Sequence, residues 1–180
     1  MQSKEDVEIT NIAVYSRNID FMLPFAEARM KPALAYLDGL TGSKSFPPTT
    51  APVIFIQECT PSDFTTIAAT PWVKERLSLA DLDPTNWATT HYGTTMLIDS
   101  HLPITAAFRV HYSKTPMDRD ALFVDVSLGS QVSHILWFPY FQDITSSRAT
   151  HIYRLSKIRW SKEFQDTLTI FQSVHMVSSW

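Results

Sequence analysis

The sequence has little cysteine and little glycine. Its 180 residues include one cysteine, Cys59, so no disulfide framework can form within the chain. Four glycines stand against eleven prolines, and this scarcity excludes the glycine-rich loops that hold phosphates in many nucleotide-binding proteins. We therefore do not expect a nucleotide site of that kind.

Long apolar runs and an excess of one charge are also missing. No uninterrupted apolar stretch approaches the roughly 20 residues needed to cross a bilayer, and residues 1–10 lack the apolar core of a signal peptide. The formal net charge is −3, which gives no basic field of the kind that dominates non-specific nucleic-acid binding. These absences predict a protein without membrane segments that resides inside the cell, in the nucleus or the cytoplasm.

The composition that is present is typical of one globular domain. Hydrophobic residues make up 44% of the chain and aromatic residues 12%, which is enough for a substantial core. The chain is too short to divide into two domains of ordinary size.

The first sixty residues have the pattern of a strand, a helix and a second strand. Residues 7–18 alternate as an extended strand, residues 22–40 have apolar side chains at helical spacing, and residues 53–58, "VIFIQE", form a short apolar run. Pro32 is expected to break or kink the helix. A strand–helix–strand unit of this length places its two strands parallel, which brings Asn18 and Glu58 to the same edge of the sheet.

The rest of the chain is predicted to contain one more helical region and three more strands. The helical region covers residues 62–77, and the strands cover residues 93–99, 104–112 and 121–128. The close spacing of these strands favours antiparallel pairing among them and predicts a mixed sheet. Beyond residue 128 we expect no further strand, only one amphipathic helix near residues 160–174.

Glu58 is the strongest candidate for chemistry. A carboxylate at the tip of an apolar strand is costly to bury unless it is paired or holds a cation. Two interpretations stay open: a structural role in a salt bridge or helix cap, or a metal ligand. Asn18 at the same edge favours the second, because Mg²⁺ is commonly held by one or two carboxylates and waters that neighbouring amides orient.

Several motifs in order resemble the endonuclease/exonuclease/phosphatase superfamily of metal-dependent phosphoesterases. They are "SRNID" and "VIFIQE", then "EARMKPAL", "YGTTMLID" and "KTPMDRDALFVDV". The branch that they resemble most is that of the 5′-tyrosyl-DNA phosphodiesterases and their fungal relatives. The resemblance covers about residues 8–128, and it implies an α/β fold, part of a two-layered α/β sandwich with mixed β-sheets.

The resemblance also implies roles for particular residues. Glu58 would bind the catalytic Mg²⁺, for which Mn²⁺ is the alternative, and Asn18 would bind the scissile phosphate or the water shell of the metal. Four further residues would line the substrate groove: Tyr92, Thr94, Thr115 and Arg119. The implied substrate is a phosphodiester such as DNA with a 5′-tyrosyl adduct, which would make the protein a hydrolase of DNA repair.

The later motifs of the superfamily are not found in residues 129–180. "VSHIL" at 132–136 and "ATHIY" at 149–153 each contain a histidine, but no Gly-Asp-x-Asn or Ser-Asp-His follows. We therefore expect residues 1–128 to be the N-terminal portion of the domain and residues 129–180 to be a divergent tail. Two functions stay open: a Mg²⁺-dependent phosphodiesterase that is incomplete in this chain, or a truncated or misspliced relative that is inactive and acts as a binding module or remnant.

Overall fold

The computed structural model describes residues 8–42, 47–111, 120–128 and 132–139. Its strands and helices follow one another in a mixed order. They are β1 (Asn11–Asn18), α1 (Ala26–Thr41), β2 (Thr50–Cys59), α2 (Pro61–Ala69), α3 (Pro71–Arg76), β3 (Leu77–Leu79), a 3-10 turn (Pro84–Asn86), β4 (Gly93–Asp99), β5 (Ile104–His111), β6 (Asp120–Leu128) and β7 (Val132–Pro139).

The first sheet has four strands in the order β1-β2-β4-β3. β1 and β2 are parallel, as their connection through α1 predicts, whereas β4 is antiparallel to both β2 and β3. Residues 51–59 of β2 are all buried, which explains why this strand is apolar on both faces. The predicted parallel unit and mixed sheet are confirmed.

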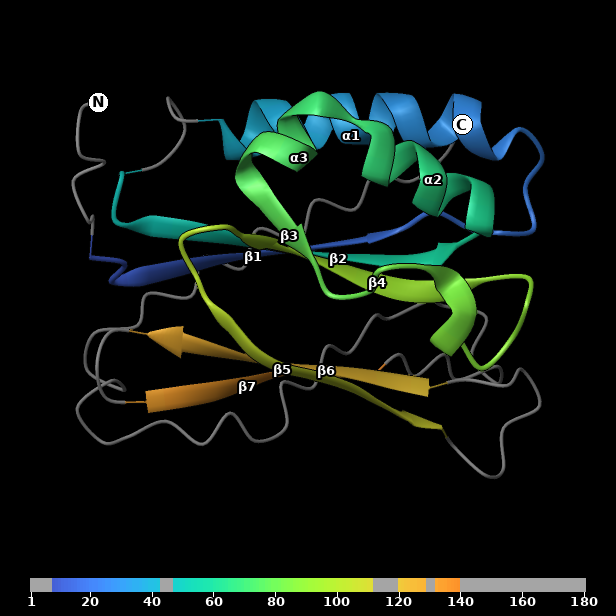
Figure 1. The fold of residues 1–180 in the computed structure, drawn as a ribbon. Helices are drawn as coiled ribbons and strands as arrows, with labels where there is room; N and C mark the ends of the chain where they lie inside the picture. Colours follow the sequence, from blue (N-terminus) through green and yellow to red (C-terminus); the bar gives the residue numbers. More distant parts are fainter. Residues whose placement is uncertain (1–7, 43–46, 112–119, 129–131, 140–180) are drawn as a thin grey trace, which may run out of the picture.

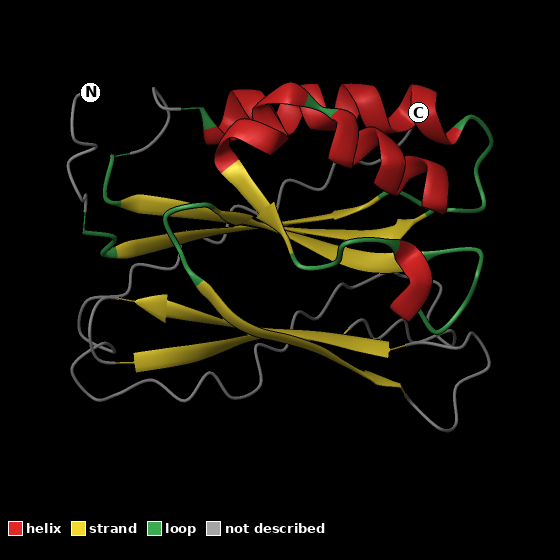
Figure 2. Ribbon diagram, in the orientation of Figure 1, coloured by secondary structure: helices red, strands yellow, loops and turns green. Residues whose placement is uncertain are grey.

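A second sheet of three antiparallel strands, in the order β5-β6-β7, packs against the first. Figure 1 and Figure 2 show three layers: the helices, the first sheet and the second sheet. The predicted pairing of β5 with β6 is confirmed, but the expected pairing of β4 with β5 is wrong. The expectation of no strand beyond residue 128 is also wrong, because β7 pairs with β6 and contains the "VSHIL" segment.

Two apolar cores lie on opposite faces of the first sheet. Between this sheet and the helices lie Ile54, Ile56 and Leu97 with Met30 and Leu34 of α1. Between the two sheets lie other side chains of β2, β4 and β6, namely Val53, Phe55, Met96, Ile98, Leu122, Val124 and Val126. The alternation along β2 thus supplies both cores, and the second sheet covers the face of the first sheet that lies away from the helices.

The helices differ from their predicted bounds at two prolines. Pro32 was predicted to break or kink the helix, but α1 continues through it to Thr41, so the helix is not broken there. The predicted helix at 62–77 is two helices, because α2 ends at Ala69 and Pro71 begins α3. A proline is well suited to the first turn of a helix, where its missing N–H leaves no hydrogen bond unmade.

Gly93 begins β4 directly against the buried ring of Trp87. A Cβ atom at this position would lie 2.6 Å from Cε2 of that ring, with other ring atoms still nearer. We expect Gly93→Ala to lower the free energy of unfolding by about 2–3 kcal/mol, because the indole cannot move without repacking against Phe64. Urea denaturation measures the change.

The control is Gly39→Ala in α1, where nothing lies within 4 Å of the new Cβ. Alanine loses less conformational entropy than glycine when a helix forms, so this variant should be about 0.5–1 kcal/mol more stable than the native chain. Equal stabilities for the two variants would contradict the packing described for Gly93.

Candidate active-site edge

The candidate site lies where β1 and β2 end. In the parallel pairing of these strands Asn18 lies opposite Gln57, the residue directly before Glu58. The Ile19 N–H donates to the Gln57 carbonyl at 2.9 Å and extends the pairing past the end of β1. The prediction that Asn18 and Glu58 share one edge of the sheet is confirmed.

A β-bulge changes the direction of the chain at Glu58. The pairing of β2 with β4 shifts register between Ile56 and Cys59, and Glu58 itself has a left-handed backbone with φ of 55°. Consequently Cys59, and not Glu58, continues the row of Ile54 and Ile56 that faces the helices. Regular alternation along β2 would place the Glu58 side chain in the core between the sheet and the helices, and the bulge keeps it out of that core.

The Glu58 carboxylate is nearly buried and unpaired. The residue is 8% exposed, and no hydrogen bond or ion pair reaches its side chain within the described part of the chain. Such a group is stabilised by a cation, and Mg²⁺ commonly takes only one or two protein carboxylates, its other ligands being waters. Glu58 therefore fits a cation ligand, although the described residues contain no cluster of three His, Cys, Asp or Glu side chains.

Left-handed backbone is concentrated at this edge. Among the described residues other than glycine, positive φ values occur at Asp20, Phe25 and Glu58. Asp20 and Phe25 belong to the loop that follows Asn18, so all three lie beside the same strand ends. Backbone conformations of this kind cost about 1–3 kcal/mol each and are typical of functional sites, where the surrounding contacts enforce them.

The loop after Asn18 is held by hydrogen bonds from two directions. The Asp20 N–H donates to Asn18 Oδ1 at 2.7 Å and so orients the asparagine side chain. From α1, the Arg29 guanidinium donates to the carbonyls of Ile19, Asp20, Leu23 and Pro24. Arg29 thus fixes the loop that positions Asn18, a function that its place in "EARMKPAL" did not reveal.

Tyr92 contributes to the same edge from the start of β4. Its ring stacks on Phe21 with the ring centroids 4.0 Å apart and the planes 15° from parallel. Phe21 follows β1 and Tyr92 precedes β4, and β2 lies between these two strands. The aromatic pair therefore spans the end of β2 where Glu58 is located.

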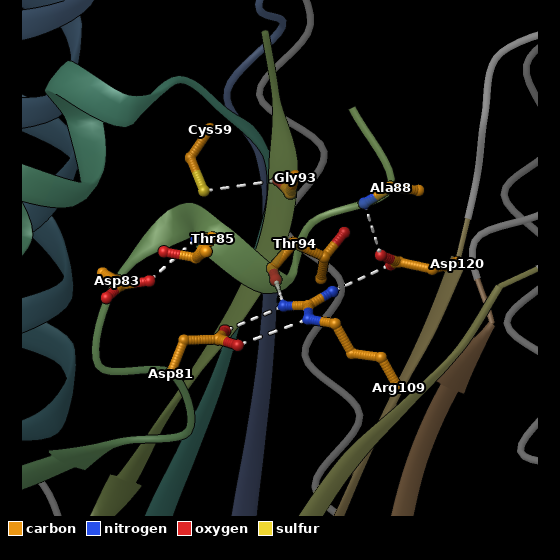
Figure 3. A network of polar contacts seen from close by, with 9 residues as sticks. All are labelled: Cys59, Asp81, Asp83, Thr85, Ala88, Gly93, Thr94, Arg109 and Asp120. Carbon is orange, nitrogen blue, oxygen red and sulfur yellow. Dashed lines mark hydrogen bonds and ion pairs between the residues drawn. The ribbon is translucent and has the colours of Figure 1, made fainter. Parts of the chain in front are cut away.

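Thr94 lies in a polar network that joins the two sheets. Arg109 of β5 donates to the carboxylates of Asp81 and Asp120, each at 2.8 Å, and to the Thr94 carbonyl (Figure 3). The Ala88 N–H completes the network with a 3.3 Å bond to Asp120. The network fixes Thr94 through its main chain, and in it Asp120 pairs with Arg109.

A cavity of about 710 Å³ lies beside this network. Asp81, Trp87 and Arg109 are among its lining residues, but Asn18 and Glu58 are not. The cavity is therefore separate from the candidate site.

The histidines near β4 lie at opposite ends of it. His91 is exposed just before Tyr92, at the Glu58 edge. His101 is bonded to Asp99, with Nδ1 2.7 Å from the carboxylate, at the far end of the strand. The pair at the far end is too remote along the strand to act on a group held by Glu58.

Two predicted groove residues and one predicted helix lie outside the described residues. Thr115 and Arg119 belong to residues 112–119, and the helix expected near residues 160–174 lies beyond residue 139.

No family model matches the chain, and no curated protein does. Its fold, however, is similar to that of solved TDP2 structures. TDP2 from Caenorhabditis elegans superposes with a TM-score of 0.51 at 19% identity over 70% of this chain and 34% of that chain. A D. rerio TDP2 humanized by 14 mutations gives a TM-score of 0.53 at 16% identity over 70% of this chain and 45% of that one.

The chain has a partial TDP2-like fold. The mixed α/β arrangement of its helices and sheets confirms the predicted fold class. At identities this low the likeness establishes the fold and not the activity. The chain spans less than half of the length of each of these two TDP2 chains, namely 34% and 45%. None of the described helices is long and apolar enough to cross a membrane.

Cys59 lies next to Glu58 in the chain but has the opposite character. Its thiol donates to the Gly93 carbonyl at 3.3 Å and is completely buried. Burial, assisted by the nearby Asp63 carboxylate, raises the pKa of the Cys59 thiol far above its ordinary value. The reactive thiolate is therefore scarce at any neutral or mildly alkaline pH.

We expect the folded chain to react with a disulfide reagent at about pH 8 at least ~100-fold more slowly than the chain unfolded in guanidinium chloride. Because the sequence has one cysteine, the absorbance change follows Cys59 alone. Similar rates in the two states would show that the thiol is accessible and would contradict its position beneath the helices.

Proposed function

We propose that this chain belongs to a phosphodiesterase-type hydrolase that depends on a divalent cation. The observation that carries the proposal is the buried, unpaired Glu58 carboxylate at the strand end of a TDP2-like fold. Its φ of 55° adds support, because the backbone accepts strain at the residue that supplies the carboxylate.

Glu58 would hold the cation, with Mg²⁺ as the expected ion and Mn²⁺ as the alternative. When bound, such an ion stabilises negative charge on phosphoryl oxygens. The bulge and the burial of Glu58 hold the carboxylate in one place, which limits the reorganisation needed during the reaction.

Asn18 and Tyr92 would act on the substrate at the same edge. The Asn18 amide would hydrogen-bond the scissile phosphate or the water shell of the ion, in an orientation fixed by the Asp20 N–H. Tyr92, stacked on Phe21, would line the groove. Thr94, near the start of β4, is proposed to line the same groove. Thr115 and Arg119 are proposed for this groove from the sequence alone.

A second candidate function is a binding module without turnover. It is favoured by the absence of a three-residue metal cluster among the described residues. The division into a superfamily portion at 1–128 and a divergent tail at 129–180 is proposed for both candidates. In the second, the same edge would bind a cation or a phosphodiester and leave it intact.

The two candidates are separated by assaying the purified chain on a 5′-phosphotyrosyl oligonucleotide and on a generic phosphodiester. Each is tested with Mg²⁺, with Mn²⁺ and with EDTA. Hydrolysis that requires the cation and disappears in Glu58→Ala supports the phosphodiesterase. A folded chain with no turnover on either substrate would leave the binding module as the function.

A further inference from the structure

The strand β5 lies at one edge of the second sheet. Among the described strands its single neighbour is β6, so its other side presents backbone N–H and C=O groups along an open edge (Figure 1). All of its residues except Ile104 and Arg109 are exposed. An edge of this kind is a template on which another strand can pair.

β5 has few of the features by which proteins protect an open edge. The usual ones are charged side chains, prolines and bulges. The bulge of β5 lies at its start, between Ile104 and Ala106, and the pairing with β6 is regular from there to His111. No lysine or proline occurs in the strand, and its one arginine, Arg109, is held in the buried network that joins the two sheets. The edge from Ala106 to His111 is therefore open to a partner.

The cavity of about 710 Å³ lies beside this edge. β5 supplies one of its walls, and residues between Ala80 and Trp87 supply another. Large apolar side chains are exposed here: Leu82 in the lining is 98% exposed, Phe108 in the lining is 45% exposed, and Val110 of β5 is 44% exposed. A molecule that lay along the edge of β5 would remove part of this apolar surface from water.

The walls of the cavity carry an excess of negative charge. Asp81 and Asp83 line it together with the Arg109 guanidinium (Figure 3). Arg109 is already shared between Asp81 and Asp120, at 2.8 Å from each carboxylate. Hydrogen bonds from the Thr85 side chain and N–H lower the pKa of the Asp83 carboxyl, which is therefore ionised at neutral pH. The cavity thus attracts a cation and repels a phosphate or a carboxylate.

We propose that an extended peptide of a partner protein adds to β5 as a further strand and places a basic side chain beside Asp83. The main chain of the peptide would pair with the open edge, and its apolar side chains would cover Leu82 and Phe108. A second copy of this chain fits less well, because it would bring two acidic cavities together while Arg109 of each copy is already bound. The surface is separate from the edge with Glu58, so the inference goes beyond the proposed hydrolysis.

The first test asks whether a peptide binds as a strand. A fluorescent peptide of alternating valine and threonine with a central lysine is titrated with the purified chain, and anisotropy follows binding. Alternate N–H groups of a strand point to opposite sides, so the peptide is also made in two N-methylated forms, each lacking one alternate set. We expect one form to bind about tenfold or more weakly than the unmodified peptide and the other to bind as well as it does. Equal binding of the two forms, or no binding of the unmodified peptide, would overturn the inference.

The second test places the peptide in the cavity. The lysine peptide should bind about threefold or more tightly than its glutamine analogue, and Asp83→Asn should remove this preference. Leu82→Ser should weaken binding of both peptides by about threefold or more. The matched controls, Glu75→Gln and Met22→Ser, change an exposed carboxylate and an exposed apolar side chain outside the cavity, and they should bind like the native chain. A lysine preference that persists in Asp83→Asn would contradict the inference.

Two other occupants of the edge would give different results. Butylammonium has the cation of a lysine side chain without a peptide main chain. If it displaced the peptide as well as unlabelled peptide does, the cavity would be a site for small cations and the inference would be wrong. A dimer in sedimentation velocity that dissociates in Leu82→Ser, without peptide binding, would assign the edge to a second copy and would refute the inference as well.

Discussion

Glu58→Gln is expected to lower cation-dependent hydrolysis by on the order of 10³-fold, which corresponds to about 4 kcal/mol in the barrier. The glutamine amide has about the same size as the carboxylate, but it carries no negative charge with which to bind a divalent cation. The measurement is kcat/KM on the 5′-phosphotyrosyl oligonucleotide in the presence of Mg²⁺.

The same substitution should leave the fold intact or stabilise it. Glu58 is nearly buried and has no partner within the described residues, so removing its charge relieves a desolvation cost. A melting temperature equal to or above that of the native chain is therefore expected, and it would separate loss of function from unfolding.

Glu27→Gln is the matched control for this result. Glu27 is exposed on α1, and its partner Lys31, whose contact lowers the pKa of the Glu27 carboxyl, is exposed as well. Hydrolysis should be unchanged in this variant. If Glu58→Gln were as active as Glu27→Gln, Glu58 would have no part in the reaction.

Arg109→Met is expected to destabilise the fold by about 3–5 kcal/mol. The Arg109 side chain is 4% exposed and lies between the carboxylates of Asp81 and Asp120, which are 5% and 7% exposed. Methionine fills much of the volume but leaves two buried carboxylates without a cation. The substitution should weaken the packing of the second sheet on the first, and urea denaturation measures the resulting loss of stability.

Arg76→Met provides the comparison on the surface. Arg76 pairs with Asp38, but both side chains are partly exposed, and water screens the pair. This variant should cost no more than about 1 kcal/mol beyond the lost contact with Trp72. Similar losses for Arg109→Met and Arg76→Met would show that the inter-sheet network is not a buried one.

The parallel pairing of β1 and β2 was predictable because it follows from local signals. Two strands joined by one helix have essentially one favoured geometry, and it places Asn18 beside the end of β2. The bulge at Glu58 was not predictable, because alternation in "VIFIQEC" extends the strand without a break. The left-handed backbone at Glu58 depends on pairing with β4, which is distant in the sequence.

The second sheet could be predicted only in part. The strands at 104–112 and 121–128 follow from their own patterns, but the assignment of β4 to the first sheet does not. Short spacing between strands favours pairing of neighbours, whereas β4 pairs with β2 and the side chains on its two faces contribute to the two cores. β7 was missed because its pattern gave no strand signal that stood out from the neighbouring sequence.

The contacts that position the candidate site join residues far apart in the sequence, and no sequence motif indicates them. Arg29 was noted only as part of "EARMKPAL", and Phe21 was not singled out. Their functions depend on the loop carbonyls and on Tyr92, which is far away in the chain. The network of Arg109 with Asp81 and Asp120 is similar, since a charge pattern does not specify which partner is buried with it.

Binding of Mn²⁺ tests the central claim most directly, because it needs neither a substrate nor turnover. Electron paramagnetic resonance follows the free ion, whose signal falls when it binds the protein. We predict that the native chain and Glu27→Gln bind Mn²⁺ and compete for it with Mg²⁺, whereas Glu58→Gln does not bind it. Equal binding of Mn²⁺ by the native chain and Glu58→Gln would contradict the assignment of Glu58 as the cation ligand.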